Sequence, residues 1–220
     1  MEGIELESDL ILMLNGVGNQ AASECYTPIM IKLILGVIAI VIGFIGYVPY
    51  FRNIASGKTK PHAFTWLVWG ILTGIAFAGQ VSSGGGFGTW VTGFTAVLCV
   101  IIFLFALWKG TKDFPLVDWL SFLGAGIGLI LWAVTKSPLA AIVLVTIIDA
   151  LGFIPTFRKS YSHPNEETAF TYTMSGLKFI FGIAALNQLS PITVIYPASL
   201  VLTNLLFVAM VQVRRQQLSI

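Results

Sequence analysis

The chain has 220 residues, of which 56% are apolar and only 10% are charged, and its mean hydropathy is +0.88. Soluble domains carry about 25% charged residues because their surface faces water, so this composition excludes an ordinary water-soluble globule. The formal net charge of +2 gives no reason to expect a nucleic-acid partner.

The segment before the first apolar stretch, residues 1–30, is acidic. Its acidic residues are Glu2, Glu5, Glu7, Asp9 and Glu24. A secretory signal would instead begin with a basic stretch ahead of its apolar region. We expect a poorly ordered extracellular segment, or a short amphipathic turn around residues 10–14 at the membrane surface.

Seven apolar stretches follow, each long enough to cross a bilayer, which takes about 20 mostly apolar residues as a helix. In chain order they are residues 31–51, 64–81, 88–108, 115–135, 138–157, 168–187 and 191–213. Only short connections remain between them. We therefore predict an all-α integral membrane fold with seven transmembrane helices.

The basic residues predict how these helices are oriented, because Lys and Arg near helix ends favour the cytoplasmic side. If seven helices alternate, one side receives Arg52, Lys58, Lys60, Lys109, Lys112, Arg158, Lys159, Arg214 and Arg215. The other side receives only Lys32 and Lys136. The pattern predicts a multi-pass cell-membrane protein with its N-terminus outside and residues 214–220 as a cytoplasmic tail.

The sequence contains an internal repeat. Residues 46–52, Gly-Tyr-Val-Pro-Tyr-Phe-Arg, correspond to residues 152–158, Gly-Phe-Ile-Pro-Thr-Phe-Arg, at an offset of 106 residues. The same offset aligns Ala-Phe-Thr-Trp at 63–66 with Ala-Phe-Thr-Tyr at 169–172, and gives nine identities across residues 46–70. Chance would give about two, so the unit is duplicated.

The repeat divides the chain into a first three-helix unit, residues 31–110, and a second, residues 137–213. A unit with an odd number of spans reverses direction, so the linker helix at residues 111–136 restores the orientation of the second unit. Parallel repeats of this kind have their solute sites near mid-membrane at the repeat interface. We expect any site between the two units.

The repeated motifs resemble those of the PQ-loop superfamily, and within it the SWEET-like transporters. The residues that carry the resemblance are Pro49-Tyr50-Phe51-Arg52 with Gly57-Lys58-Thr59, and Pro155-Thr156-Phe157-Arg158 with the loop to Thr168. Tyr50 and Thr156 stand where that superfamily has its glutamine. The resemblance implies a plasma-membrane carrier that moves a small polar solute such as a sugar by alternating access. It leaves proton coupling open.

Two ionisable residues, Asp149 and Lys178, fall well inside predicted membrane helices. At 1.5 Å of rise per residue, both should lie at about 13–16 Å from the same boundary. Their helices are consecutive and antiparallel, so we predict an ion pair that faces the bundle interior. Ionisable groups inside a membrane are costly and tend to be functional. The pair would bind solute, take up a proton, or serve as a structural bridge.

Four further residues are candidates for the substrate-binding site. The resemblance implies that Asn204 corresponds to a pocket asparagine, with an interhelical hydrogen bond as the alternative. It also implies that the second helix of each unit lines the pocket, which selects Trp66, Trp69 and Tyr172, whose rings could stack on a solute. Tyr196 falls near an outer helix end, where interfacial aromatic residues are common.

Each repeat also has a proline and an arginine near the cytoplasmic end of its first helix. Pro49 and Pro155 are candidate hinges, because a proline inside a helix frees a carbonyl and kinks it; the alternative is that each proline ends its helix. Arg52 and Arg158 are candidate gate residues, with partners among Asp113, Glu166 and Glu167, or else anchors at the headgroup level.

We therefore predict a membrane transporter whose partners are a small-molecule solute and the lipid bilayer, with a homo-oligomer left open. The alternative is a receptor or sorting protein on the same scaffold, as in the KDEL receptors, which resemble SWEET-like folds. An enzyme is not expected, because no catalytic constellation lies in the predicted helices and His62 and His163 fall in loops. No cofactor or metal is implied.

Overall fold

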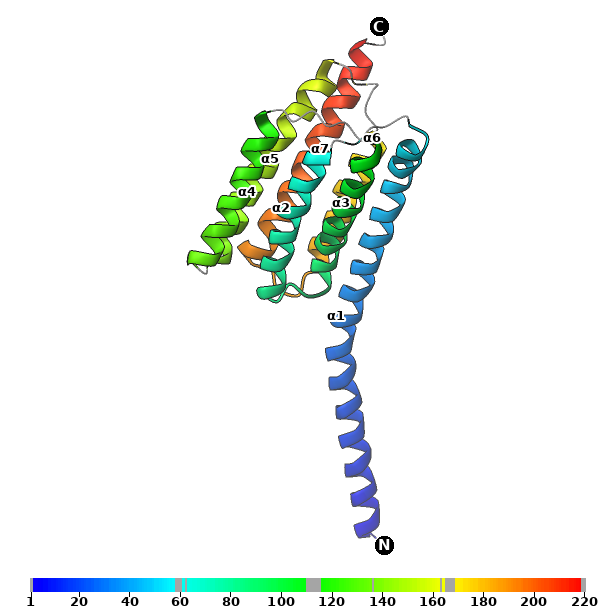
Figure 1. The fold of residues 1–220 in the computed structure, drawn as a ribbon. Helices are drawn as coiled ribbons and strands as arrows, with labels where there is room; N and C mark the ends of the chain where they lie inside the picture. The colour runs from blue at the N-terminus through cyan, green and yellow to red at the C-terminus, as the bar shows by residue number, and fades with distance from the viewer. Residues whose placement is uncertain are drawn as a thin grey trace.

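The computed structural model describes the backbone of residues 2–57, 61, 63–109, 116–135, 137–162, 164 and 169–218. Within these residues the chain forms seven α-helices and one short 3-10 helix (Figure 1). They are α1 (Glu2–Ala55), α2 (Ala63–Ser82), η1 (Gly86–Gly88), α3 (Thr89–Lys109), α4 (Leu116–Thr135), α5 (Pro138–Ser162), α6 (Ala169–Ala184) and α7 (Pro191–Leu218). The predicted all-helical architecture is confirmed.

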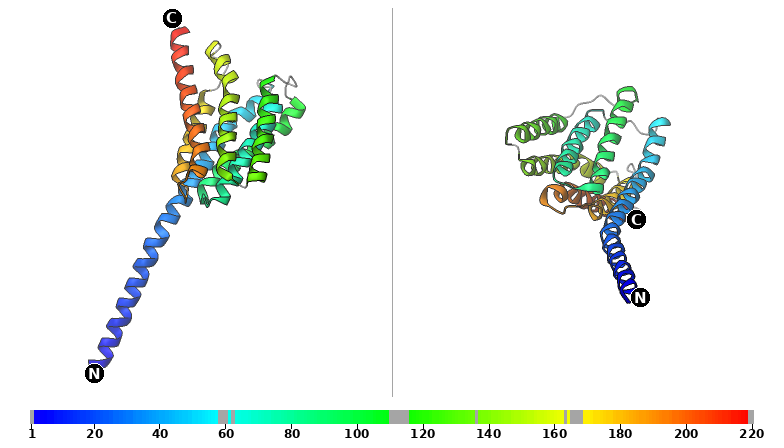
Figure 2. Two further views of the ribbon diagram at one scale, coloured as in Figure 1. Left: turned by 90° about the vertical axis from the view of Figure 1, so that its left-hand side faces the viewer. Right: turned by 90° about the horizontal axis from the view of Figure 1, so that it is seen from below.

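Helix α1 differs most from the sequence-based prediction. It is continuous from Glu2 and contains Pro28 and Pro49 in its interior, whereas the sequence-based prediction began this helix at residue 31. The acidic residues of its first turns favour a helix there, because negative charges are stabilised near a helix N-terminus. The N-terminal part of α1 extends well beyond the rest of the bundle (Figures 1 and 2).

Three segments of the described chain are long and apolar enough to cross a membrane. They are Thr27–Ala55, Gly86–Lys109 and Pro191–Leu218, and two shorter apolar helices cover Trp66–Ser82 and Pro138–Ile154. Many large apolar side chains face outward, such as Phe44 on α1, Leu104 on α3 and Ile130 on α4. An apolar surface of this extent is compatible with a membrane protein.

The helices pack in the same order within each three-helix unit. In the first unit the backbone of α3 lies close to both α1 and α2, whose own backbones do not approach each other closely. In the second unit α7 stands in the same relation to α5 and α6. The third helix of each unit therefore lies between the first and the second. This shared packing order matches the repeat found in the sequence.

The two units meet through equivalent pairs of helices. The first helix of one unit packs on the second helix of the other, which gives an extensive α1–α6 interface and a smaller α2–α5 interface. Helix α4 packs on α5 and α2 at one edge of the bundle (Figures 1 and 2). Equivalent helices run in the same direction, and the two termini lie at opposite ends of the molecule (Figure 1).

We name the two ends of the bundle for what lies there. The C-terminal end holds the last turns of α1, α5 and α7, and the η1 end holds η1 and the connection between α6 and α7 (Figure 1). The largest core cluster lies between the units and includes Leu72 on α2, Val145 on α5 and Phe179 on α6. Any site between the units is enclosed by this core.

Candidate functional site

Lys178 is fully buried in the middle of α6. Its Nζ donates a hydrogen bond to the Thr95 hydroxyl on α3 at 2.9 Å, and that hydroxyl donates in turn to the Val91 carbonyl at 2.8 Å. The ammonium also lies over the rings of Tyr47 and Phe179, at 5.0 and 4.8 Å from their centroids. Each of these partners is a neutral group, so within the part of the chain that the structure describes Lys178 is oriented by its contacts but has no counter-ion.

A glycine on α1 makes room for this lysine. A Cβ built at Gly43 would lie 3.2 Å from Cδ of Lys178 and 3.0 Å from Cε1 of Phe94. At the repeat offset Gly43 is the counterpart of Asp149, and Leu72 is the counterpart of Lys178. The first unit thus has a glycine where the second has its acid, and the lysine packs against that glycine.

Asp149 is the second buried charge, on α5, with 5% of its surface exposed. It interacts with Tyr196 on α7. The Tyr196 hydroxyl is itself buried, without a hydrogen bond of good geometry to any described residue. Cys99 on α3, buried and with a free thiol, lies within electrostatic reach of both Asp149 and Lys178.

The predicted ion pair between Asp149 and Lys178 is absent from the described residues. Lys178 bonds to Thr95 instead, and no carboxylate oxygen of Asp149 lies within ion-pair distance of its Nζ. The prediction assumed that consecutive antiparallel helices are neighbours, but α7 lies between α5 and α6. Lys178 is directed toward Thr95 on α3, whereas Asp149 interacts with Tyr196 on α7.

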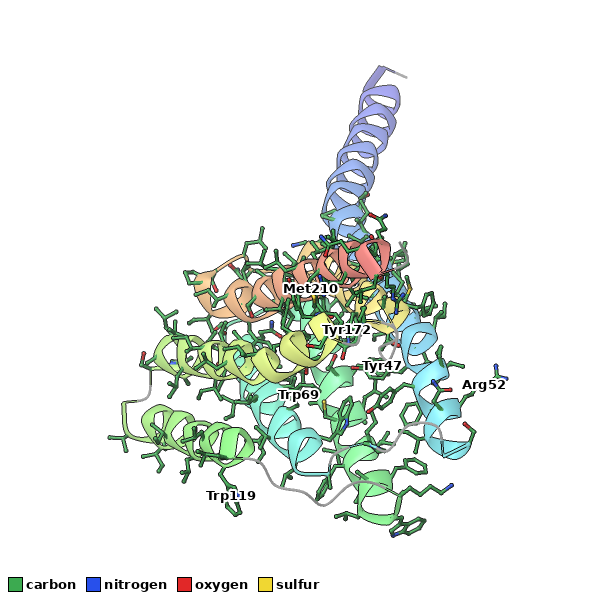
Figure 3. All side chains as sticks on the ribbon, turned by 90° about the horizontal axis from the view of Figure 1, so that it is seen from above. Tyr47, Arg52, Trp69, Trp119, Tyr172 and Met210 are labelled. Carbon is green, nitrogen blue, oxygen red and sulfur yellow. The ribbon has the colours of Figure 1, made fainter. Side chains whose placement is uncertain are left out.

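The three aromatic candidates lie in one aromatic cluster near the starts of α2 and α6, toward the C-terminal end of the bundle. Figure 3 labels two of them, Trp69 and Tyr172. Trp66 packs edge-on against Trp69 at 5.2 Å between centroids, and Trp69 stacks on Phe153 of the other unit at 6.5 Å. Phe153 continues the contact to Tyr172 at 5.9 Å. The cluster is completed by Tyr50, Phe157 and Phe207. It joins both units and fills the space between them.

Asn204 lies at the interface between α6 and α7. Its Nδ2 donates to the Leu200 carbonyl of its own helix at 2.6 Å, and a Cβ at Gly176 would lie 3.5 Å from its Cβ. The side chain is buried, with 3% of its surface exposed. Its amide group is thus held within α7, one turn from the aromatic cluster member Phe207.

Backbone and side-chain hydrogen bonds close the η1 end of the bundle. The buried Gln80 Nε2 on α2 donates to the Thr193 carbonyl at the start of α7, at 2.9 Å. The Gly88 amide donates to the Ala185 carbonyl at 3.2 Å, and the Asn187 amide donates to the Gly85 carbonyl at 2.9 Å. These bonds tie the connections of one unit to those of the other.

The structure describes only some of the candidate hinge and gate residues. Pro49 lies inside α1, which continues to Ala55, and the backbone of α5 continues past residue 155 to Ser162; neither proline ends its helix. Arg52 is exposed and points away from the bundle (Figure 3). The side chains of Pro155 and Arg158 lie outside the described part of the chain. So do the candidate gate partners Asp113, Glu166 and Glu167, together with His62 and His163.

Sequence reasoning missed four residues that surround the buried charges: Tyr47, Thr95, Cys99 and Tyr196. Tyr196 was expected at the membrane interface, but it is fully buried, because α7 begins at Pro191 and Tyr196 already lies one turn inside the bundle. Thr95 carried a weak signal, as a polar residue in an apolar helix. Tyr47 carried another, since it follows the repeated Gly46.

The comparisons with known proteins found no match: no family model matches this sequence, and neither a curated protein nor a solved structure is significantly similar to it. The class of protein is therefore defined by fold and site alone. It is an all-helical bundle whose apolar helices are compatible with a membrane protein, made of two like-oriented three-helix units that enclose two separated ionisable residues, Asp149 and Lys178.

Proposed function

We propose that this protein is a transporter that moves a small polar solute across a membrane by alternating access. The observation that carries the proposal is a polar cluster between the two units. Its buried members are Thr95, Cys99, Asp149, Lys178 and Tyr196, and the partly buried Tyr47 completes it. Ionisable groups inside an apolar bundle are costly and are retained mostly where they handle solutes, ions or protons.

The surroundings of the cluster support a carrier rather than an open channel. The aromatic cluster separates it from the C-terminal end, and the Gln80–Thr193 bond with its neighbouring loop contacts separates it from the η1 end. A carrier needs a state that is closed on both sides between its two open states. Rocking of one repeat against the other would open either end in turn.

The test has two stages, binding and movement. The purified full-length protein is screened for a thermal shift with a panel of sugars, amino acids, nucleosides and vitamins, since a ligand of the folded state raises its melting temperature in proportion to affinity and concentration. Each compound that stabilises the protein is then followed as a radiolabel into proteoliposomes. We expect uptake that saturates with concentration and is lost in Lys178→Met.

The matched control is Lys109→Met, which removes an exposed lysine from the C-terminal end of α3 and should leave uptake unchanged. Equal loss in both variants would show that Lys178 has no special role. A compound that binds but never enters the vesicles would contradict transport and favour the receptor alternative.

A further inference from the structure

The two buried charges raise a question that the transport proposal leaves open, which is the kind of solute they accept. Lys178 is surrounded by a hydroxyl and two aromatic rings. Asp149 interacts with Tyr196, whose buried hydroxyl makes no hydrogen bond of good geometry to a described residue. Desolvating one charge costs several kcal/mol unless an opposite charge comes close. If the pair served only to hold helices together, the two groups should touch, and they do not.

The packing of the units explains why the charges stay apart. Lys178 lies against Gly43, in the α1–α6 interface. Asp149, the repeat counterpart of Gly43, lies on α5 and interacts with Tyr196 on α7. Among the described contacts, Lys178 thus has no acidic partner and Asp149 has no basic partner. Cys99 lies within reach of both.

The net charge of this arrangement limits what it can accept. With Lys178 protonated and Asp149 ionised, the cluster holds one positive and one negative charge, so it is neutral before the solute arrives. A purely anionic or cationic solute would satisfy one group but leave the other unpaired, with an extra charge in a low-dielectric interior. An uncharged sugar would leave both groups without a counter-ion. A solute with one charge of each sign satisfies both groups and keeps the whole neutral.

We propose that the solute is a zwitterion of the amino-acid type, whose carboxylate binds the Lys178 ammonium beside Thr95 and whose ammonium binds the Asp149 carboxylate beside Tyr196. This inference rests on the proposed transport function and narrows it. Charge-assisted hydrogen bonds of this kind are about twice as strong as neutral ones, which gives the site its selectivity against sugars.

The test compares free amino acids with derivatives in which one charge is blocked. Thermal shifts of the full-length protein are titrated with L-amino acids, their N-acetyl derivatives, which lack the ammonium, their amides, which lack the carboxylate, and with monosaccharides. We expect a free amino acid to bind and each blocked derivative to bind at least tenfold more weakly. Monosaccharides should give no shift.

Variants then assign each charge to its partner. Asp149→Asn should remove the difference between an amino acid and its N-acetyl derivative, and Lys178→Met the difference between an amino acid and its amide. Thr95→Val, which keeps the lysine but removes its hydrogen-bond acceptor, should weaken binding of the free amino acid severalfold. Thr173→Val is the matched control, because that exposed hydroxyl on α6 donates only to its own helix, at 3.0 Å to the Ala169 carbonyl.

The outcomes separate this inference from the transport proposal. A monosaccharide that binds and enters proteoliposomes, with amino acids inert, would overturn the zwitterion and leave transport standing. Amino acids that bind without entering the proteoliposomes would support a zwitterionic solute and contradict the transport proposal. Blocked derivatives that bind as well as the free amino acid would overturn the charge assignment, whatever crosses the membrane.

Discussion

At the residue scale, the setting of Lys178 is the feature on which the site depends. The amine has one hydrogen-bond acceptor, the Thr95 hydroxyl, and two ring faces, and ring faces attract a cation by only about 0.5–2 kcal/mol. These contacts orient the ammonium but do not neutralise it. The position opposite Lys178 on α1 is Gly43, which lacks a side chain that could do so.

Gly43→Asp is the sharpest test at this scale. It would place on α1 the acid that the second repeat has at Asp149, next to the Lys178 side chain. We expect the free energy of unfolding of Gly43→Asp to be about 1–3 kcal/mol higher than that of Gly43→Ala, because the aspartate adds a hydrogen bond between charged groups. Gly43→Ala is the control, since its Cβ meets the same neighbours, at 3.0 and 3.2 Å, without the carboxylate. The measurement is chemical denaturation in detergent.

Solute binding should respond in the opposite sense. In Gly43→Asp the new carboxylate binds the Lys178 ammonium, which is then no longer free for the solute. The affinity for the solute, measured by thermal-shift titration, should be at least tenfold lower than in Gly43→Ala. Identical stability and identical binding in the two variants would mean that position 43 does not face Lys178.

At the scale of elements, the α1–α6 interface is the most extensive contact between the two units. A Cβ at Gly46 would lie 2.6 Å from Cβ of Met174, far inside ordinary contact. The Thr171 hydroxyl donates to the Gly46 carbonyl at 3.3 Å, one turn before Pro49. The repeated Gly-x-x-Pro motif therefore brings α6 onto the backbone of α1 beside the candidate hinge.

Gly46→Ala should push α1 and α6 apart, whereas Gly74→Ala on α2 should leave the helix packing unchanged. We expect Gly46→Ala to destabilise the protein by about 1–3 kcal/mol through overpacking. Gly74 has open space around its Cβ position, so Gly74→Ala should be neutral, or stabilising by up to about 1 kcal/mol from helix propensity. Thermal unfolding in detergent measures both; if Gly46→Ala matched Gly74→Ala, the close approach of α1 and α6 would be refuted.

At the scale of the whole molecule, the seven-helix order predicts which end of the bundle faces which compartment. The basic residues predict that the C-terminal end is cytoplasmic, which puts the exposed Ser56 inside the cell and the exposed Leu189, in the connection before α7, outside. In intact cells an impermeant maleimide should label Leu189→Cys and leave Ser56→Cys unlabelled, in a Cys25→Ala, Cys99→Ala background. Labelling of both positions would contradict the predicted topology.

Much of the architecture could be predicted from local sequence. Runs of about 20 apolar residues predicted all seven helices, and the ends of α2 to α5 agree with the prediction within a few residues because polar and glycine-containing connections flank them. The duplication was readable from residues 46–70 and 152–176 alone. Helix α1 was the exception, since an acidic segment without strong apolar character still continued the helix to Glu2.

The site could be predicted only in part. Asp149, Lys178 and the aromatic residues of α2 and α6 were identified because charges and large rings stand out in apolar helices. Their partners were not, because which side chains meet depends on the order in which helices pack. The third helix of each unit inserts between the first two, so Asp149 meets Tyr196 and Lys178 meets Thr95. Spacing along the chain does not encode that insertion; it follows from how apolar faces and small residues such as Gly43 and Gly46 fit together in three dimensions.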